Sequence, residues 1–295
     1  MRRKFIGSLV AMSSAPNDTK TLFKNCGTCS QTFAHLVNRA YKHREPMHER
    51  ALDPLAGGIF REGHQCGMLW GACLATAAEA YRRCESLNEA RALALHASAE
   101  LIASFEDQNH SIACREITGV KMNSFFGLLK FMIETMVKGM DNSTCFMIAE
   151  KWTPKALEAS ERGLQKDDGD ADVEPPAYNC AALVASQWGA TDEETVLVAG
   201  FAGGLGLSGK GCGALAAAIW LRSLKWLKEH PGEELPMFRF PAISNMIAEF
   251  KKETGGRMRC AEICSRHFAS AQEHSDFILQ GGCQNLIECL GNRLN

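Results

Sequence analysis

The sequence lacks long apolar runs, a clear excess of one charge, and the alternating pattern of β-strands. Its longest apolar stretch, Ala214 to Leu221, is far shorter than the ~20 residues of a membrane-spanning helix. Lys and Arg number 32 against 34 Asp and Glu, whereas a nucleic-acid-binding domain usually presents a basic face. No Asn-Gly or Asp-Gly turn separates two apolar strands. These absences argue against a membrane protein, a nucleic-acid-binding protein and a β-fold.

What remains is the composition of an ordinary folded protein with helical periodicity. Hydrophobic residues make up 46% and charged residues 22% of 295 residues, a length that suggests about two domains. Apolar residues recur at helical spacing over 66–84 and 88–105. The segment 125–136 is almost continuously apolar, which predicts a buried helix. The expected fold class is all-α.

The N-terminus allows two interpretations. Arg2-Arg3 resembles the start of a twin-arginine export signal, but Pro16 ends the following apolar region after about ten residues. We therefore expect residues 1–25 to be an N-terminal tail and the protein to be cytoplasmic. The alternative is a periplasmic protein exported through the twin-arginine route.

A fixed internal repeat is the strongest signal in the sequence. Gly57 recurs as Gly203, Cys66 as Cys212 and Cys114 as Cys260, all at one offset (212 − 66 = 146). A fixed period indicates duplicated structural units. We expect two similar helical-bundle units, residues 26–151 and 176–295, docked on each other and joined by a linker, 152–175.

The acidic stretch before the second unit, 166–176, has no apolar periodicity and ends in two prolines, which is typical of a linker. A calcium loop is a weaker alternative. Only Asp168, Asp170 and Asp172 fit its spacing, and no Glu closes it.

The abundance of cysteine, 13 residues, needs an explanation. Eight of them occupy comparable positions in the two units: Cys29, Cys66, Cys114 and Cys145 in the first, and Cys180, Cys212, Cys260 and Cys283 in the second. The remaining five have no counterpart: Cys26, Cys73, Cys84, Cys264 and Cys289. Buried free cysteine commonly behaves as a small hydrophobe, and we expect this of Cys73 and Cys84.

The order Cys, Gly-Gly, Cys-Gly-Ala-x-x-Gly, Cys, Cys resembles the redox-active family named for its C-GCAxxG-C-C pattern, present here twice. The first copy, from Cys66 to Gly71, replaces the alanine with Met68, and the second, from Cys212, replaces the final glycine with Ala217. The resemblance implies a cysteine-based redox function and marks the eight repeated cysteines as its site residues.

Each motif cysteine follows a glycine-rich loop at the start of a helix. Unpaired amides and the helix dipole there favour thiolate over thiol. We therefore expect Cys66 and Cys212 to have the lowest pKa values, with Cys114 and Cys260 as their partners. The four cysteines of each unit should cluster in space.

Other motif interpretations are weaker. The segment 204–210 resembles a phosphate loop, but Gly211 stands where the magnesium-binding hydroxyl should be. Cys26 and Cys29 form a CxxC pair without the strand context of a thioredoxin fold. His64 and His110 lie near motif cysteines in the sequence, although surface positions are more typical of histidine.

Three functions stay open. The cysteines could cycle between dithiol and disulfide, transferring electrons to or from a partner. They could instead bind an iron–sulfur cluster or another soft metal, for which four cysteines is the usual number. The third alternative is a non-catalytic helical scaffold. Candidate partners are a redox protein and a second copy of the chain.

Overall fold

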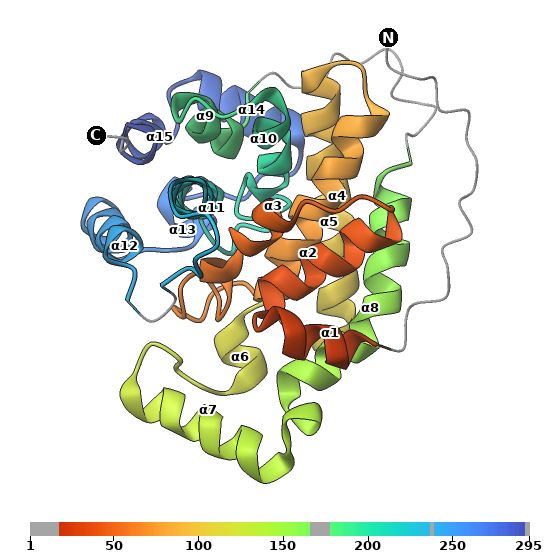
Figure 1. Cartoon of the computed structure of the whole chain (residues 1–295). Coiled ribbons are helices and arrows are strands. Elements are labelled where there is room, and N and C mark those ends of the chain that lie inside the picture. The colour runs from red at the N-terminus through yellow and green to blue at the C-terminus, as the bar shows by residue number, and fades with distance from the viewer. Residues whose placement is uncertain (1–17, 166–177, 237–238, 293–295) are drawn as a thin grey trace.

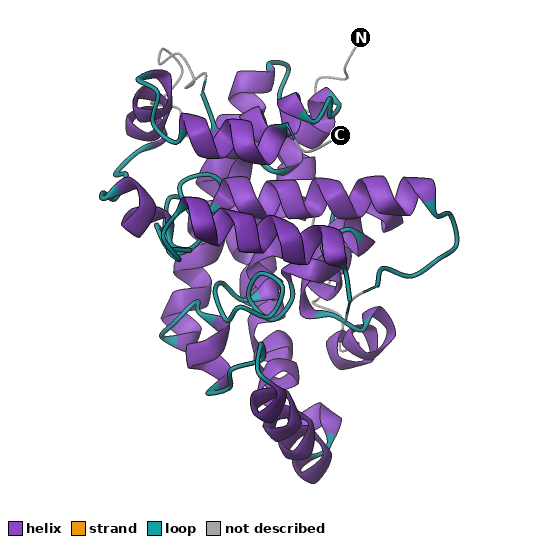
Figure 2. Cartoon of the chain, turned by 90° about the vertical axis from the view of Figure 1, so that its left-hand side faces the viewer, coloured by secondary structure: helices purple, strands orange, loops and turns teal. Residues whose placement is uncertain are grey.

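The computed structural model describes residues 18–165, 178–236 and 239–292, and within these ranges it is built from helices without a β-strand (Figure 2). One isolated antiparallel bridge pairs Gln65 with Ala113. The all-α prediction is confirmed. The α-helices and short 3₁₀ helices (η) run in the order α1 (Thr19–Cys26), α2 (Cys29–Ala40), α3 (Pro46–Arg50), η1 (Asp53–Leu55), α4 (Gly67–Arg83), α5 (Leu87–Asn109), α6 (Cys114–Thr118), α7 (Phe125–Lys138), η2 (Met140–Asn142), α8 (Thr144–Gly163), α9 (Cys180–Gln187), α10 (Asp192–Leu197), η3 (Ala199–Phe201), α11 (Gly213–Glu229), α12 (Pro241–Glu253), α13 (Cys260–Cys264), α14 (Ala271–Leu279) and α15 (Gln284–Gly291).

Side-chain caps fix where several helices begin. Thr28 accepts a hydrogen bond from the Gln31 amide at the start of α2, and Thr191 forms a reciprocal capping box with Glu194 in α10. Ser124 and Ser270 cap α7 and α14 at positions one repeat apart. Each cap satisfies an amide that the first helical turn leaves unpaired.

The repeat seen in the sequence is also a repeat of structure. Helix α4 spans 67–83 and α11 spans 213–229, so both bounds shift by the same offset as the cysteines. The short helix η1 recurs as η3, and α6 recurs as α13, again with equal bounds. The chain thus contains two tandem units of similar topology.

The two units dock reciprocally. Helix η1 of the first unit contacts α11 of the second, and η3 of the second contacts α4 of the first. In the same way α3 contacts α11 and α10 contacts α4. His48 and Glu194 occupy equivalent positions in the repeat, and their side chains lie 3.9 Å apart across the contact. This is the self-complementary pattern of a two-fold interface, here within one chain.

A single cluster of buried apolar side chains runs through both units. At the contact, the rings of Trp70 and Phe201 pack nearly perpendicular to each other, with centroids 4.9 Å apart. The Trp220 indole donates a hydrogen bond to the His48 carbonyl oxygen at 3.1 Å. The prediction that the units dock on each other is therefore confirmed, and the docking surface is part of the core.

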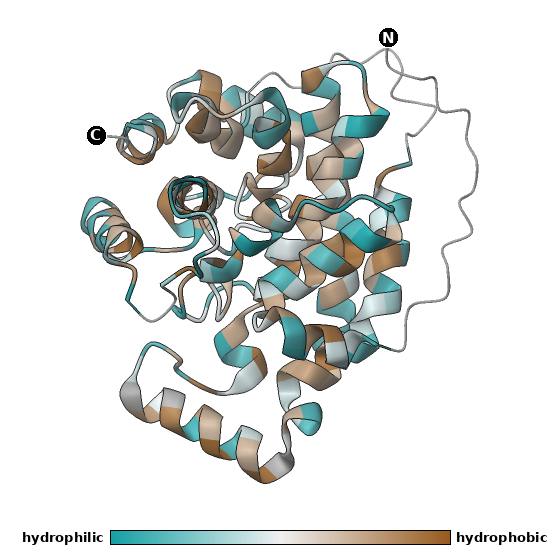
Figure 3. Cartoon of the chain, viewed as in Figure 1, coloured by the Kyte–Doolittle hydropathy of each residue, from teal (hydrophilic) through white to brown (hydrophobic). Residues whose placement is uncertain are grey.

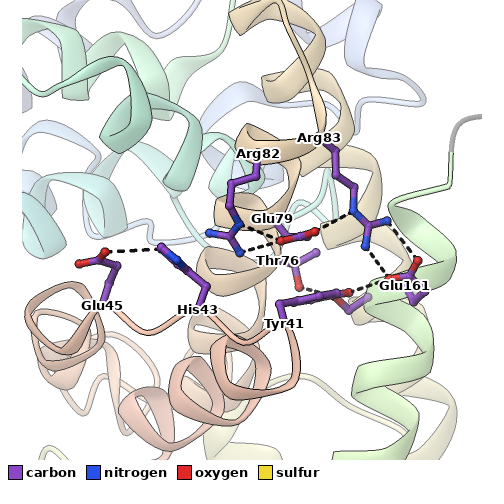
Figure 4. A network of polar contacts seen from close by, with 9 residues as sticks. Tyr41, His43, Glu45, Thr76, Glu79, Arg82, Arg83 and Glu161 are labelled. Atoms are coloured by element: carbon purple, nitrogen blue, oxygen red, sulfur yellow. Dashed lines mark hydrogen bonds and ion pairs between the residues drawn. The ribbon is translucent and has the colours of Figure 1, made fainter. Parts of the chain in front are cut away.

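A polar network ties α4 to α8 and to the end of α2 in the first unit (Figure 4). The hydroxyl groups of Tyr41 and Thr76 lie 2.8 and 2.7 Å from the Ser160 hydroxyl. Arg83 on α4 donates two hydrogen bonds to the Glu161 carboxylate. Buried hydroxyls and charges are thereby paired where three segments meet, which fixes their register.

Helix α7 forms over the predicted segment, but the expectation that it is buried is wrong. Met132 and Ile133 are 53% and 52% exposed, and Met136 and Val137 about 80%. The helix projects from the body of the molecule at the bottom of Figure 1, and brown apolar segments remain visible along it in Figure 3. Continuous hydrophobicity establishes that a helix forms, but only the available packing partners decide burial.

Helix α8 extends through Gly163, so the predicted boundary between unit and linker at 151/152 falls inside a helix. Trp152, Ala156 and Leu157 are buried on it, and this helical spacing explains why the unit continues. The N-terminal segment with Arg2-Arg3, and the aspartates considered for calcium, lie outside the described residues. None of the described helices has both the length and the apolar composition that crossing a membrane requires.

Candidate functional site

Every one of the eight repeated cysteines lies at the start of a helix. Cys29, Cys114, Cys180 and Cys260 are the first residues of α2, α6, α9 and α13; Cys66, Cys212 and Cys283 are the N-caps of α4, α11 and α15; and Cys145 is the second residue of α8. Amides without helical partners are concentrated there. In both units the repeated cysteines therefore lie at helix N-termini.

The glycine-rich loop before each motif cysteine is a left-handed turn. Five successive residues from Gly57 to Arg61 have φ between 51° and 79°, and the five from Gly203 to Leu207 have φ between 55° and 88°. Ile59 and Leu205 are non-glycine residues at equivalent places in the two turns. A left-handed backbone conformation costs an L-residue roughly 1–2 kcal/mol. Contacts with the surrounding structure must therefore stabilise this conformation in both turns.

This turn directs an amide at the first cysteine of each unit. The Gly57 N–H donates a hydrogen bond to the Cys29 sulfur, and the Gly203 N–H donates one to the Cys180 sulfur. Both donors lower the pKa of the thiol that they contact. The sequence pattern associates the loop with Cys66 and Cys212 instead.

In the first unit, the thiols of Cys29 and Cys66 are hydrogen-bonded to each other. This bond is the largest influence that lowers the pKa of Cys29, and it raises the pKa of Cys66 well above its ordinary value. Gly67 makes the contact sterically permissible, since a Cβ there would lie 2.5 Å from the Cys29 sulfur. The glycine of the Cys-Gly motif is therefore a requirement of the thiol pair.

The other two cysteines of the first unit lie close enough to act on this pair. Charge on Cys114 and Cys145 raises the pKa of Cys66, and burial raises the pKa of Cys145 to about 12. Two backbone bonds hold the start of α6 beside the start of α4, from the Cys66 amide to Ile112 and from the Cys114 amide to His64. The structure thus brings the four predicted cysteines of this unit together.

The second unit also gathers its predicted cysteines, but around a different contact. The Cys264 sulfur lies 3.4 Å from that of Cys283 and 3.9 Å from that of Cys260. Cys180 and Cys212 interact electrostatically with this group. The repeat pattern omits Cys264, because the first unit has no cysteine at its place. Its spacing of four from Cys260 on a helix is the signal that could have identified it.

The expectation that Cys66 and Cys212 have the lowest pKa values is wrong. Burial raises the pKa of Cys212 to about 12, although the amides of Leu215 and Ala214 in the first turn of α11 donate to its sulfur. Among the cysteines whose shift is resolved, only Cys29 has a lowered pKa. Desolvation outweighs the helix N-terminus where the thiol is fully buried.

The final glycine of the motif distinguishes the two units. A Cβ at Gly71 would lie 2.0 Å from the Ser30 carbonyl oxygen, so α2 and α4 cross in direct backbone contact. The second unit has Ala217 at this place, fully buried on α11. The second unit therefore lacks the glycine that allows this direct backbone contact in the first.

The other cysteines and histidines considered in the sequence are not members of the two thiol clusters. Cys73 and Cys84 are buried in the apolar core, as expected. The Cys26 thiol hydrogen-bonds to Thr32, and burial raises its pKa to about 11. His64 is half-buried in a small pocket of ≈ 120 Å³ with Lys210 and Arg115, and burial lowers its pKa. The expectation of a surface position holds for His110, which is exposed, and fails for His64.

Among the described residues, no group of side chains is arranged to hold a single metal ion. Across residues 18–165, 178–236 and 239–292, no three Cys, His, Asp or Glu side chains are positioned to hold a metal ion together. The thiols of Cys29 and Cys66 contact each other in the first unit, and in the second the Cys264 sulfur contacts those of Cys283 and Cys260. The donor set of these residues therefore does not fit a single ion in this arrangement.

Comparison with known proteins gives one match. A family model described as "Putative redox-active protein (C_GCAxxG_C_C)" matches residues 27–158 and again residues 178–294. No curated protein and no solved structure matches the chain. The two matches cover most of the chain and include all eight repeated cysteines.

Proposed function

The chain belongs to the C-GCAxxG-C-C redox-active family in two tandem copies, and from this premise we propose that it exchanges dithiol for disulfide with a partner protein. The observation that carries the proposal is the proximity of the Cys29 and Cys66 thiols, for which Gly67 leaves room: a Cβ there would lie 2.5 Å from the Cys29 sulfur. Exchange needs one thiol that ionises readily and a second within reach to resolve the intermediate. The first unit has both.

The chemistry follows from the two environments. The Cys29 thiolate, stabilised by Cys66 and by the Gly57 amide, attacks one sulfur of the partner's disulfide and releases the other as a thiolate. The Cys66 sulfur then attacks the Cys29 sulfur of this mixed disulfide. The Cys29–Cys66 bond forms, the second partner thiolate leaves, and the protons of the two cysteines pass to the two released thiolates. The partner is reduced by two electrons and the chain is oxidised by two.

The difference in burial assigns the nucleophilic role to Cys29 and the resolving role to Cys66. The residue Cys29 is of intermediate exposure, whereas Cys66 is only 6% exposed. The residue whose thiol has the lowered pKa is thus the more exposed of the two, as a nucleophile requires. We place the reaction in the cytoplasm, where thiols are kept reduced.

The test is a thiol and metal inventory of anaerobically purified protein. Metal-free protein that loses thiols in pairs on treatment with oxidised glutathione, and regains them with dithiothreitol, supports the proposal. Stoichiometric iron and sulfide would replace it with a cluster-binding function. Thiols that react only after unfolding would indicate a scaffold.

Two variants identify the reacting pair. Cys29→Ser should prevent the first attack, while Cys66→Ser should trap glutathione on Cys29 because the resolving thiol is missing. Cys84→Ser is the matched control, since its side chain is buried away from the site and should leave exchange unchanged. Wild-type exchange in the Cys29→Ser variant at the first unit would overturn the assignment.

A further inference from the structure

The two units make their closest thiol contacts with different cysteines. In the first, Cys29 and Cys66 are hydrogen-bonded. In the second, the sulfur of Cys264 lies between those of Cys283 and Cys260, at 3.4 and 3.9 Å. Cys264 lies outside the four-cysteine pattern, so the family motif does not account for this contact.

The five clustered cysteines of the second unit differ in their exposure to solvent. Cys180, Cys212 and Cys260 are each no more than 8% exposed. Cys264 and Cys283 are both of intermediate exposure. The two sulfurs that lie closest together are therefore also the two that an external disulfide can approach, and exchange depends on such access.

The distance is short enough for a bond. A disulfide requires its sulfurs about 2.05 Å apart. The Cys264 and Cys283 sulfurs must close a gap of roughly 1.4 Å from their 3.4 Å separation, within the reach of side-chain rotation. Cys283 is the N-cap of α15 and Cys264 is the last residue of α13, so both lie at helix ends.

The first unit has no equivalent pair. One repeat before Cys264 stands Thr118, whose hydroxyl donates a hydrogen bond to the Cys114 carbonyl oxygen at 2.7 Å. A hydroxyl cannot form a disulfide. Whatever Cys264 contributes is therefore specific to the second unit.

We propose that Cys264 and Cys283 form the dithiol/disulfide pair of the second unit, making the chain a protein with two different redox pairs. This inference rests on the proposed function. Once deprotonated, the Cys264 sulfur attacks one sulfur of an external disulfide and expels a thiolate. Contact with Cys260 raises the pKa of Cys264 to about 12, so a smaller fraction of this thiol is ionised than of Cys29. The Cys283 sulfur then attacks Cys264, the Cys264–Cys283 bond forms, and a second thiolate leaves. The two protons of the pair go to the two leaving thiolates, and the external disulfide is reduced by two electrons.

The experiment uses the full-length reduced protein, treated anaerobically with oxidised glutathione, quenched with acid and alkylated. Tryptic cleavage after Arg266 separates the peptide that carries Cys264 from the one that carries Cys283, so a bond between them yields a cross-linked pair. Fragmentation then distinguishes Cys264 from Cys260, and Cys283 from Cys289. The expected product is the Cys264–Cys283 disulfide.

Three variants make the assignment specific. Cys264→Thr introduces the residue that the first unit carries and should reduce the cross-linked peptide by at least about tenfold. Cys283→Ser should leave glutathione bound to Cys264, because the resolving thiol is gone. Cys289→Ser, in the same tryptic peptide as Cys283, is the control and should retain the cross-link. Far-ultraviolet circular dichroism establishes that each variant keeps its helices.

The outcomes separate this inference from the function on which it rests. Disulfides that join Cys180 to Cys212, or Cys260 to Cys283, with Cys264 alkylated, would overturn the assignment of Cys264 while supporting exchange. Native protein in which no thiol of either unit is oxidised would overturn both.

Discussion

At Cys29, three kinds of donor act on one sulfur: the Cys66 thiol, the Gly57 amide and the amides of Cys29 and Ser30 at the start of α2. Together they outweigh desolvation at Cys29, whereas each of the other seven repeated cysteines has a raised pKa. A helix N-terminus alone is not sufficient, since Cys145 and Cys212 have one and still have raised pKa values. The number of donors that reach the sulfur decides the sign.

Replacing Cys66 with alanine should therefore shift the ionisation of Cys29. The lost hydrogen bond is charge-assisted, so the pKa of Cys29 should rise. The measurement is the pH dependence of Cys29 alkylation by iodoacetamide in a Cys26→Ser background, because Cys26 and Cys29 share a tryptic peptide. Cys84→Ala serves as the control. An unchanged midpoint in Cys66→Ala would contradict the thiol pair.

The carboxyl group of Asp53 should make the stability of the protein depend on pH. Burial raises its pKa to about 7, although the Thr28 hydroxyl donates a hydrogen bond to it. Its ordinary value is 3.8, so the folded state binds the proton more tightly than the unfolded state does. The stability that this group contributes is complete below pH 3.8 and is lost as the pH rises to about 7.

The asparagine of Asp53→Asn cannot ionise, so the variant should not lose this stability as the pH rises. The urea midpoint of the variant should depend less on pH than that of the wild type between about pH 4 and 7. Chemical denaturation at several pH values in that window measures it. Identical slopes for the two proteins would show that the carboxyl titrates normally in the folded state.

Among the elements, the left-handed turn before α4 is the one whose geometry positions the site. Gly58 has a φ of 79°, and a Cβ there would lie 2.4 Å from the His64 amide nitrogen. The turn thus needs glycine for its backbone conformation and for space. Its copy at Gly204 is equally crowded, with the Gly211 carbonyl oxygen at 2.7 Å.

Gly58→Ala should lower the free energy of unfolding by clearly more than the strain of a left-handed alanine alone. Gly119 is the matched control, because its φ is 66° and a Cβ added there would meet no atom within 4 Å. We expect Gly119→Ala to lower the free energy of unfolding by about 1 kcal/mol, and Gly58→Ala to lower it by at least about 2 kcal/mol more because of the backbone clash. Urea denaturation measures both, and equal effects would refute the steric argument.

For the whole molecule, the reciprocal docking of η1 on α11 and of η3 on α4 makes the two units parts of one core. Trp70 from the first unit and Phe201 from the second are both fully buried in it. Units that share core side chains lose them together on unfolding. The duplicated chain should therefore unfold as one cooperative body.

Phe201→Ala tests this directly. The truncation leaves a cavity beside Trp70 and should lower the free energy of unfolding by about 3–5 kcal/mol. Met132→Ala on the exposed α7 should change it by less than about 0.5 kcal/mol. Circular dichroism and tryptophan fluorescence should report coincident single transitions in the wild type. Two separated transitions would show that the units fold independently.

The sequence by itself determined the helical class, the two units and the eight cysteines, because these depend on periodicity and on a repeat that survives in the residue order. It could not assign roles to the thiols. Cys29 and Cys66 are 37 positions apart, and their contact depends on a turn that brings the Gly57 amide to one and on the absence of a side chain at Gly67. The exposure of α7 and the position of Cys264 beside Cys283 were likewise decided only in three dimensions, because burial and sulfur–sulfur distance depend on which neighbours pack against a residue.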